Sequence, residues 1–340
     1  MGIDTPLAHE THRAVTQTGP MGVRKRGSAL LVSTLLVLAT GCSSDSGSGQ
    51  PGASSTTSEP AGLDVTSTTV SFSDLSRTTD GGDGSGPVPG RELDTTIWYP
   101  TEGDGPFPLV VFSHGYKASP EDYAELIEFW AARGMVVAAP RFPLTATGTP
   151  EIRTDLPQQP GDVSFVLDQV LDLARTQGSE IEGLIDPERI AAAGHSAGGL
   201  TSALLVSDCC FDDRIDAVTV LASGPLDYLV PELGVEQPSA YVSPGVPMLF
   251  VHGGADDAIP VEQAQVLYQY APNGKAFVLA PFATHSDPYG DPADDSWQVI
   301  AGSSAGFLEW ALQVDSDGLT QMRSAVEADG AASFLDDELP

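Results

Sequence analysis

The feature that most constrains this chain is an alternation of short apolar runs with helix-length amphipathic segments, which begins near Val65. The run PLVVFSHG at residues 108–115 is almost continuously apolar, as a strand covered on both faces of a sheet must be. Helical patterns follow at residues 119–134 and 161–178, where apolar side chains recur three and four positions apart. Strands that alternate with helices in this way form a mostly parallel central sheet flanked by helices on both faces. The sequence therefore predicts an α/β fold over residues 65–340.

The remaining elements follow from the same periodicity. Strands are expected at residues 68–75, 93–100, 135–140, 189–194, 217–223, 247–253 and 275–281, the first two as an antiparallel pair, and further helices at residues 198–207, 261–271, 295–314 and 318–330. Two longer irregular stretches, Arg141–Pro160 and Gly224–Gly245, follow the carboxyl ends of strands, where open parallel sheets bind ligands. We expect both stretches to form walls of a substrate pocket or a partial cap over it.

The N-terminus carries the features of an export signal. Arg24, Lys25 and Arg26 precede an apolar segment at residues 28–40, which is too short to span a bilayer. The letters LATGC then end at Cys42 and resemble the signal of bacterial lipoproteins, in which the cysteine receives the lipid.

Three regions are therefore predicted. Residues 1–41 are a leader and lipoprotein signal peptide, with Met21 as a second candidate start. Residues 42–64 are rich in Ser, Gly, Thr and Pro and form a flexible tether, whereas residues 65–340 form the folded domain. The protein is expected to be exported and to be held by a lipid at Cys42 on the extracytoplasmic side of the cell membrane.

The charge of the chain excludes some partners. There are 47 acidic and 15 basic residues, which give a formal net charge of −32. Such a surface repels the phosphates of nucleic acids and the head groups of anionic lipids. We therefore expect no nucleic-acid partner, and membrane contact only through the anchor. The sequence does not indicate an oligomeric state.

The cysteines and histidines do not suggest a metal. Cys42 is assigned to the lipid, and the adjacent Cys209 and Cys210 are left either as a disulfide or as two thiols. No group of His and Cys has the spacing of a structural zinc site. Neither a metal nor another cofactor is predicted.

The pattern Gly-x-Ser-x-Gly occurs twice, at Ser196 and at Ser304. A nucleophilic serine on a sharp turn needs a strand that leads into it, small neighbours, and a helix that leaves it. Ser196 has all three, in the letters RIAAAGHSAGGL. Ser304 lies in the middle of a helical pattern, where small residues allow close helix packing. The sequence therefore predicts Ser196 as the nucleophile.

A nucleophilic serine also needs a base and an orienting acid. His285 is the candidate base, because it lies in a loop that follows the last predicted strand. The other histidines of the domain, His114, His195 and His252, are expected to shape turns or bind backbone. Asp256 is the preferred acid, since it follows the preceding strand, and its neighbour Asp257 remains the alternative. Asp287 is a weaker candidate because it is close to His285 in sequence.

An oxyanion hole needs two backbone N–H groups. Ala197 follows the nucleophile and supplies the first. Tyr116 supplies the second, because Gly115 allows the backbone to turn after the early strand. The Tyr116 ring is also expected to line the acyl pocket.

These motifs together resemble the α/β-hydrolase superfamily, over roughly residues 65–314. The layout is similar to the branch that holds platelet-activating-factor acetylhydrolases, dienelactone-hydrolase-like proteins and bacterial cutinase-like polyester hydrolases. The resemblance implies Ser196, Asp256 and His285 as the triad, with Tyr116 and Ala197 as oxyanion donors. It departs from cutinase-like enzymes at Ala197, where they usually carry Met.

The sequence predicts a serine esterase that cleaves carboxylic esters, small-molecule or lipid, through an acyl-serine intermediate without a cofactor. Two alternatives stay open. An amidase or peptidase would use the same triad on a different leaving group. A non-catalytic binding protein on the cell surface would need no triad at all.

Overall fold

The computed structural model describes residues 62–80, 86–234, 245–272 and 274–340. These residues belong to one compact unit, Ser58–Pro340. The predicted leader, the predicted lipidation at Cys42 and all of the predicted tether up to residue 61 lie outside the described residues. No prediction about them is tested by the fold.

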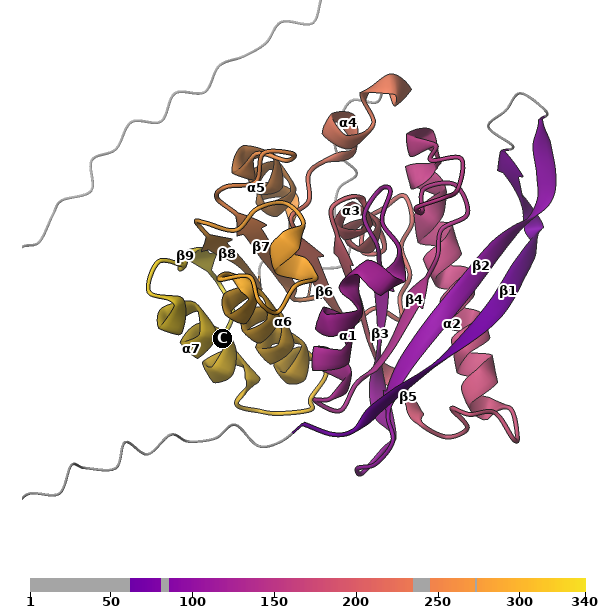
Figure 1. Cartoon of the computed structure of the whole chain (residues 1–340), viewed down its shortest axis with the longest axis horizontal. Coiled ribbons are helices and arrows are strands. Elements are labelled where there is room, and N and C mark those ends of the chain that lie inside the picture. The colour runs from indigo at the N-terminus through magenta and orange to yellow at the C-terminus, as the bar shows by residue number, and fades with distance from the viewer. Residues whose placement is uncertain (1–61, 81–85, 235–244, 273) are drawn as a thin grey trace, which may run out of the picture. The chain divides into compact units, whose positions relative to one another are not determined.

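The described part of the chain is built on a nine-stranded sheet in the order β1-β2-β4-β3-β5-β6-β7-β8-β9 (Figure 1). The strands are β1 (Val65–Asp80), β2 (Pro87–Pro100), β3 (Phe107–Ser113), β4 (Val136–Pro140), β5 (Ile185–His195), β6 (Ala217–Leu221), β7 (Met248–Gly253), β8 (Lys275–Ala280) and β9 (Ser333–Asp337). The six strands from β4 to β8 in this order run parallel. The outer pairs β1/β2, β2/β4 and β8/β9 are antiparallel.

Helices cover both faces of the sheet (Figure 1). One face packs against α1 (Ala124–Ala131), α6 (Trp297–Ala311) and α7 (Gly318–Asp329), and the other packs against α2 (Gln159–Arg175), α3 (Ala197–Leu204) and α5 (Val261–Tyr270). The remaining short elements are α4 (Leu226–Leu229) and four 3₁₀ turns, η1 (Pro120–Tyr123), η2 (Arg153–Gln158), η3 (Pro231–Leu233) and η4 (Asp287–Tyr289). Within the described ranges, no helix is both long enough and apolar enough to cross a membrane.

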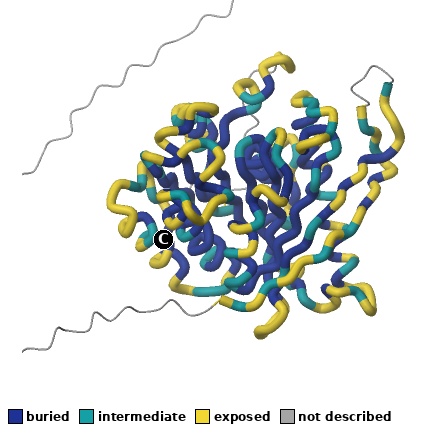
Figure 2. Tube along the Cα trace, in the orientation of Figure 1, coloured by how far each residue is buried: buried dark blue, intermediate teal, exposed yellow. Residues whose placement is uncertain are grey.

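Strand β3 shows why a continuous apolar run is needed at the centre of this sheet. Successive side chains of a strand point to opposite faces. Val110 and Phe112 lie in the core on the side of α1 and α6, whereas Leu109 and Val111 lie in the core on the side of α2. All four side chains are fully buried, and Figure 2 shows the central strands as the most buried part of the tube.

The structure confirms the predicted alternation and extends it. The antiparallel pair is present, but β1 and β2 are longer than expected, and most of the Ser and Thr side chains of β1 are exposed. The helix expected at residues 119–134 is shorter, since residues 120–123 form the 3₁₀ turn η1 and α1 begins at Ala124. Strand β9 was not predicted, because its five residues carry no alternation of apolar and polar side chains.

A buried ion network joins the β1–β2 ribbon to α2. Arg91 is 1% exposed and donates two hydrogen bonds to Asp155, of 3.0 and 2.7 Å, and two to Asp162, of 2.6 and 2.7 Å. Arg77 contacts Asp162 at 2.7 Å and Asp74 at 2.6 Å. Burial raises the pKa of Asp155, and the hydrogen bonds from Arg91 offset this effect only in part. The network holds η2 and the start of α2 against the sheet.

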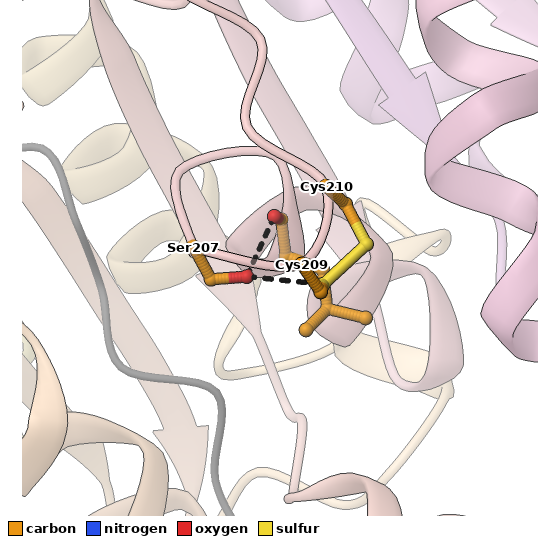
Figure 3. The surroundings of a disulfide bond; sticks show 4 residues. Ser207, Cys209 and Cys210 are labelled. Carbon is orange, nitrogen blue, oxygen red and sulfur yellow. Dashed lines mark hydrogen bonds between the residues drawn. A yellow bond between two sulfur atoms is a disulfide. The ribbon is translucent and has the colours of Figure 1, made fainter.

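The structure joins the adjacent Cys209 and Cys210 by a disulfide, which was one of the two possibilities left open by the sequence. The bond lies in the loop that follows α3, where Ser207 Oγ is 3.4 Å from the sulfur of Cys209 (Figure 3).

Replacing Arg91 by Ala should lower the free energy of unfolding by about 3–5 kcal/mol, because it leaves two buried carboxylates short of their partner. Urea unfolding of Arg91→Ala and of the matched control Arg175→Ala would measure this effect. Arg175 pairs with Asp172 on the surface, where the side chains are 63% and 74% exposed, so the control should change by less than about 1 kcal/mol. Equal losses in the two variants would contradict this role for the network.

Candidate active site

Ser196 lies on a sharp turn between β5 and α3. Its backbone has φ 55° and ψ −122°, a conformation that residues other than Gly rarely adopt. The Ser196 N–H donates to the carbonyl of Leu221 on β6 at 2.8 Å, which ties the turn to the neighbouring strand. This is the strand–turn–helix arrangement that the sequence predicted around Ser196.

The two glycines of the motif are required by backbone contacts. A Cβ at Gly198 would lie 1.9 Å from the carbonyl oxygen of Ser113 on β3, and a Cβ at Gly194 would lie 2.3 Å from the carbonyl oxygen of Gly198. Both distances are too short for any side chain. The turn therefore packs directly on the end of β3, and no larger residue fits at either position.

The structure brings Ser196, His285 and Asp256 into one hydrogen-bonded chain. Asp256 Oδ2 accepts from His285 Nδ1 at 2.7 Å, which leaves His285 Nε2 as the acceptor for the Ser196 hydroxyl at 3.0 Å. Asp256 follows β7 and His285 follows β8, so each side chain comes from the carboxyl end of a parallel strand. Asp257, the alternative acid, is exposed, and Asp287 is also exposed; among the described residues, the carboxylate that hydrogen-bonds to His285 is that of Asp256.

Asp256 is held as an ionised carboxylate. Burial alone would raise the pKa of Asp256, but hydrogen bonds from His285 and from the Ile259 N–H outweigh it, so the pKa lies below its usual value. Its second oxygen accepts from the N–H groups of Ala258 at 3.0 Å and Ile259 at 2.8 Å. A carboxylate fixed in this way favours the His285 tautomer with its proton on Nδ1.

The other three histidines of the domain bind backbone atoms, as the sequence predicted. His114 Nδ1 donates to the carbonyl of Gly115 at 2.8 Å, and His252 Nε2 donates to that of Ile259 at 2.8 Å. Burial lowers the pKa of His114 to about 4 and that of His195 to about 3, so both rings are neutral at pH 7. Neither ring is poised to exchange a proton near neutral pH.

His195 also connects the turn to the loop of His285, a connection that sequence reasoning missed. Its Nε2 donates to the backbone carbonyl of His285 at 2.7 Å, and its Nδ1 accepts from the hydroxyl of Tyr123 at 2.8 Å. The Tyr123 oxygen in turn accepts from the N–H of Gly115 at 3.2 Å. These contacts join the loop after β3, the residue before Ser196 and the loop after β8. No local pattern around Tyr123 signals this role.

The predicted oxyanion donors lie beside Ser196. Tyr116 and Ala197 both line the pocket that contains Ser196 and His285. Neither backbone N–H has a hydrogen-bond acceptor in the described part of the chain, so both are available to a ligand. The Tyr116 hydroxyl donates to the carbonyl of Glu151 at 2.5 Å and thereby fixes the ring.

Ser304, in the second copy of the motif, is remote from this chain of contacts. It lies inside α6 and is fully buried. Its hydroxyl donates to the carbonyl of Ile300 at 2.7 Å and accepts from the Trp130 indole at 3.2 Å. Nearby, a Cβ at Gly306 would lie 2.6 Å from the carbonyl oxygen of Gly318 at the start of α7. The small residues here allow close helix packing, as predicted.

Two pockets share Tyr116, Ser196 and His285 in their walls. The larger pocket has a volume of about 420 Å³, and most of its other lining residues are polar. The smaller pocket has a volume of about 310 Å³, and most of its other lining residues are apolar. The smaller pocket is lined by Tyr116, Arg153, Leu156, Ser196, Ala197, Tyr228, Leu229, Ala258, Ile259 and His285. Residues from both irregular stretches therefore form its walls, which confirms the expectation for Arg141–Pro160 and for the described part of Gly224–Gly245. The described residues contain no group of three or more His, Cys, Asp or Glu arranged to hold a metal ion.

Comparison with known proteins supports this reading of the fold. A family model described as Chlorophyllase matches residues 85–229. With the sheet order and the flanking helices, this match identifies the architecture. The chain has an α/β-hydrolase fold. The match favours a hydrolase that acts on esters.

Two curated relatives of this chain are described only as uncharacterized. Protein YfhR of Escherichia coli O157:H7 is 27% identical over 126 residues, which are 34% of this chain and 44% of that protein. YfhR of Escherichia coli strain K12 is 26% identical over 126 residues. The chain thus spans less than half the length of the relatives that it matches.

The family match covers only part of the site. Residues 85–229 include Tyr116, Ser196 and Ala197, whereas Asp256 and His285 lie beyond them. The hydrogen-bonded chain from Asp256 through His285 to Ser196 therefore rests on the tertiary structure of this chain.

The buried histidines predict a loss of stability in mild acid. A histidine of the unfolded chain binds a proton below about pH 6.5, whereas folded His114 does so only near pH 4. Its contribution to stability is therefore complete above about pH 6.5 and declines as the pH falls toward 4, by about 2 kcal/mol at about pH 5.

Urea unfolding at about pH 7 and about pH 5 would test this expectation on the unmodified protein and on His114→Gln, which keeps a polar side chain but does not titrate. The loss between the two pH values should be smaller in the variant by about 2 kcal/mol. The same loss in both proteins would show that His114 does not carry the pH dependence.

Proposed function

We propose that this protein is a serine hydrolase that cleaves carboxylic esters through an acyl-serine intermediate. The observation that carries the proposal is the continuous chain from Asp256 through His285 to Ser196, with hydrogen bonds of 2.7 and 3.0 Å. A serine hydroxyl is a weak nucleophile at neutral pH unless a base takes its proton as it attacks. His285 Nε2 is in position to be that base.

In the acylation step, Ser196 Oγ attacks the carbonyl carbon of the ester while its proton passes to His285 Nε2. Asp256 stabilises the imidazolium that forms and keeps it in the productive orientation. The backbone N–H groups of Tyr116 and Ala197 donate to the oxyanion of the tetrahedral intermediate. His285 then donates the proton to the departing alkoxide, and the alcohol leaves.

In the deacylation step, a water molecule takes the place of the alcohol. His285 removes its proton, the hydroxide attacks the acyl carbon, and the second oxyanion is held by the same two N–H groups. Collapse of this intermediate releases the carboxylic acid and returns the proton to Ser196. No metal or organic cofactor takes part in either step.

Replacing Ser196 by Ala should lower kcat for a short-chain p-nitrophenyl ester by about 10⁴-fold or more, since the nucleophile is lost. Ser304→Ala is the matched control, because it removes the serine of the other copy of the motif and should keep activity within a few-fold. Initial rates of the two variants and of the unmodified protein provide the comparison.

Equal activity of Ser196→Ala and the unmodified protein would overturn the proposal. A protein without activity on any ester would support a binding role instead. Parallel assays on a p-nitrophenyl ester and the p-nitroanilide of the same acid would separate an esterase from an amidase or peptidase. We expect faster turnover of the ester, whose leaving group needs less acid catalysis.

We further propose that the enzyme is exported and held at the membrane by a lipid on Cys42. The support comes from the sequence alone, from the basic residues and short apolar segment that precede this cysteine. A Cys42→Ala variant should lose labelling by a radioactive fatty acid and move from the membrane fraction to the soluble exported fraction. Unchanged fractionation and labelling of the variant would contradict the anchor.

A further inference from the structure

Arg153 has no carboxylate partner among the described residues, although acidic residues outnumber basic ones 47 to 15 in this chain. Every other arginine in the described part of the chain forms an ion pair with Asp or Glu. Arg153 is exposed, lines the smaller pocket beside Ser196, and has no ion pair or hydrogen bond among the described residues. An unpaired cation in this position is available to a ligand.

The neighbours of Arg153 hold its charge at the pocket. The guanidinium carbon lies 5.0 Å from the centre of the Tyr116 ring, within the range of a cation–π contact. That ring is fixed by its hydrogen bond to the carbonyl of Glu151. Lys117 and Glu151 both have positive φ, 64° and 58°, and form an ion pair with each other at 2.8 Å. Among the described residues, the other cation near the Tyr116 ring is Lys117, and its charge is neutralised by Glu151. Arg153 is therefore the cation near this ring that has no ion pair to a described residue.

The two pockets differ in charge. Among the described residues that line the smaller pocket, Arg153 is the one Arg, Lys, Asp or Glu, and the wall around it is largely apolar. The larger pocket includes three carboxylates in its wall, those of Asp122, Asp287 and Asp291, and one cation, Lys117, whose charge is paired with Glu151. An anionic group on a substrate is repelled by the larger pocket and attracted by the smaller one. Such a substrate is therefore expected to lie across Ser196 with its anionic group in the smaller pocket.

We propose that the natural substrate is an ester that carries an anionic group, a carboxylate or a phosphate, and that Arg153 binds this group in the smaller pocket. The inference rests on the proposed esterase function and names its substrate class. A guanidinium binds either anion through paired N–H donors. The apolar wall contributed by Leu156, Leu229 and Ile259 contacts the short hydrocarbon segment between the anion and the ester carbonyl.

The test uses pairs of esters that differ in charge. On the acyl side, p-nitrophenyl hydrogen glutarate is compared with p-nitrophenyl valerate, which has an acyl chain of the same length. On the alcohol side, 4-acetoxybenzoate is compared with its neutral methyl ester. The variants are Arg153→Gln, which removes the charge, and Arg153→Lys, which keeps it. Arg175→Gln is the control for loss of a surface arginine, since Arg175 is exposed and is paired with Asp172.

In one of the two pairs, we expect Arg153→Gln to lower kcat/KM for the anionic ester by about 10–100-fold, mostly through KM. The neutral ester of that pair should change by less than about twofold. Arg153→Lys should recover a large part of the lost kcat/KM, and Arg175→Gln should leave all four esters unchanged. The pair that responds identifies whether the smaller pocket takes the acyl or the alcohol side.

The inference would be overturned if Arg153→Gln lowered the rates for charged and neutral esters equally, or lowered neither. Ser196-dependent hydrolysis of the neutral esters would then still support the esterase. Hydrolysis of none of the four esters by the unmodified protein would overturn the esterase itself, and the inference with it. Where the inference holds, butyrate and butyl phosphate are compared as inhibitors of the hydrolysis of p-nitrophenyl valerate. The stronger inhibitor identifies the preferred anion, and its inhibition should be lost in Arg153→Gln.

Discussion

The site depends on one strained turn, in which Ser196 takes a left-handed backbone conformation where β5 meets α3. The turn is possible because Gly198 packs against the backbone of Ser113, at a separation that leaves no room for a Cβ. The strain of a residue in this region costs about 1–3 kcal/mol and must be offset by the surrounding structure. Here the offset comes from the fully buried strands on either side of β5 and from the hydrogen bond of Ser196 to Leu221 on β6.

The parallel sheet brings the rest of the site to this turn. The carboxyl ends of parallel strands lie on one edge of a sheet, so the loops that follow β3, β7 and β8 converge where β5 ends. His195 then ties two of these loops together, since it contacts Tyr123 on one side and the backbone of His285 on the other. A neutral, buried ring suits this task, because both of its nitrogens can be satisfied without a charge.

A second set of contacts shapes the pocket rather than the reacting groups. The buried Arg91 holds Asp155 of η2 and Asp162 of α2, and η2 begins with Arg153. Holding a loop by buried charges has an energetic cost, because the desolvation of each buried ion costs several kcal/mol. It sets a specific geometry, however, because the guanidinium is satisfied only when both carboxylates face it.

The sequence by itself determined the order of the longer strands and helices from β1 to α7, because apolar periodicity reflects which side chains each element must bury. It also determined the turn at Ser196, since small residues and an entering strand are local requirements, and it singled out His285 and Asp256 by their places after predicted strands. Only the tertiary structure placed Asp256 rather than Asp257 against His285, joined Tyr123 to His195, and left Arg153 beside the pocket without an ion pair to any described residue. These last features depend on which side chains meet across loops distant in sequence, and such meetings leave no periodic pattern in the chain.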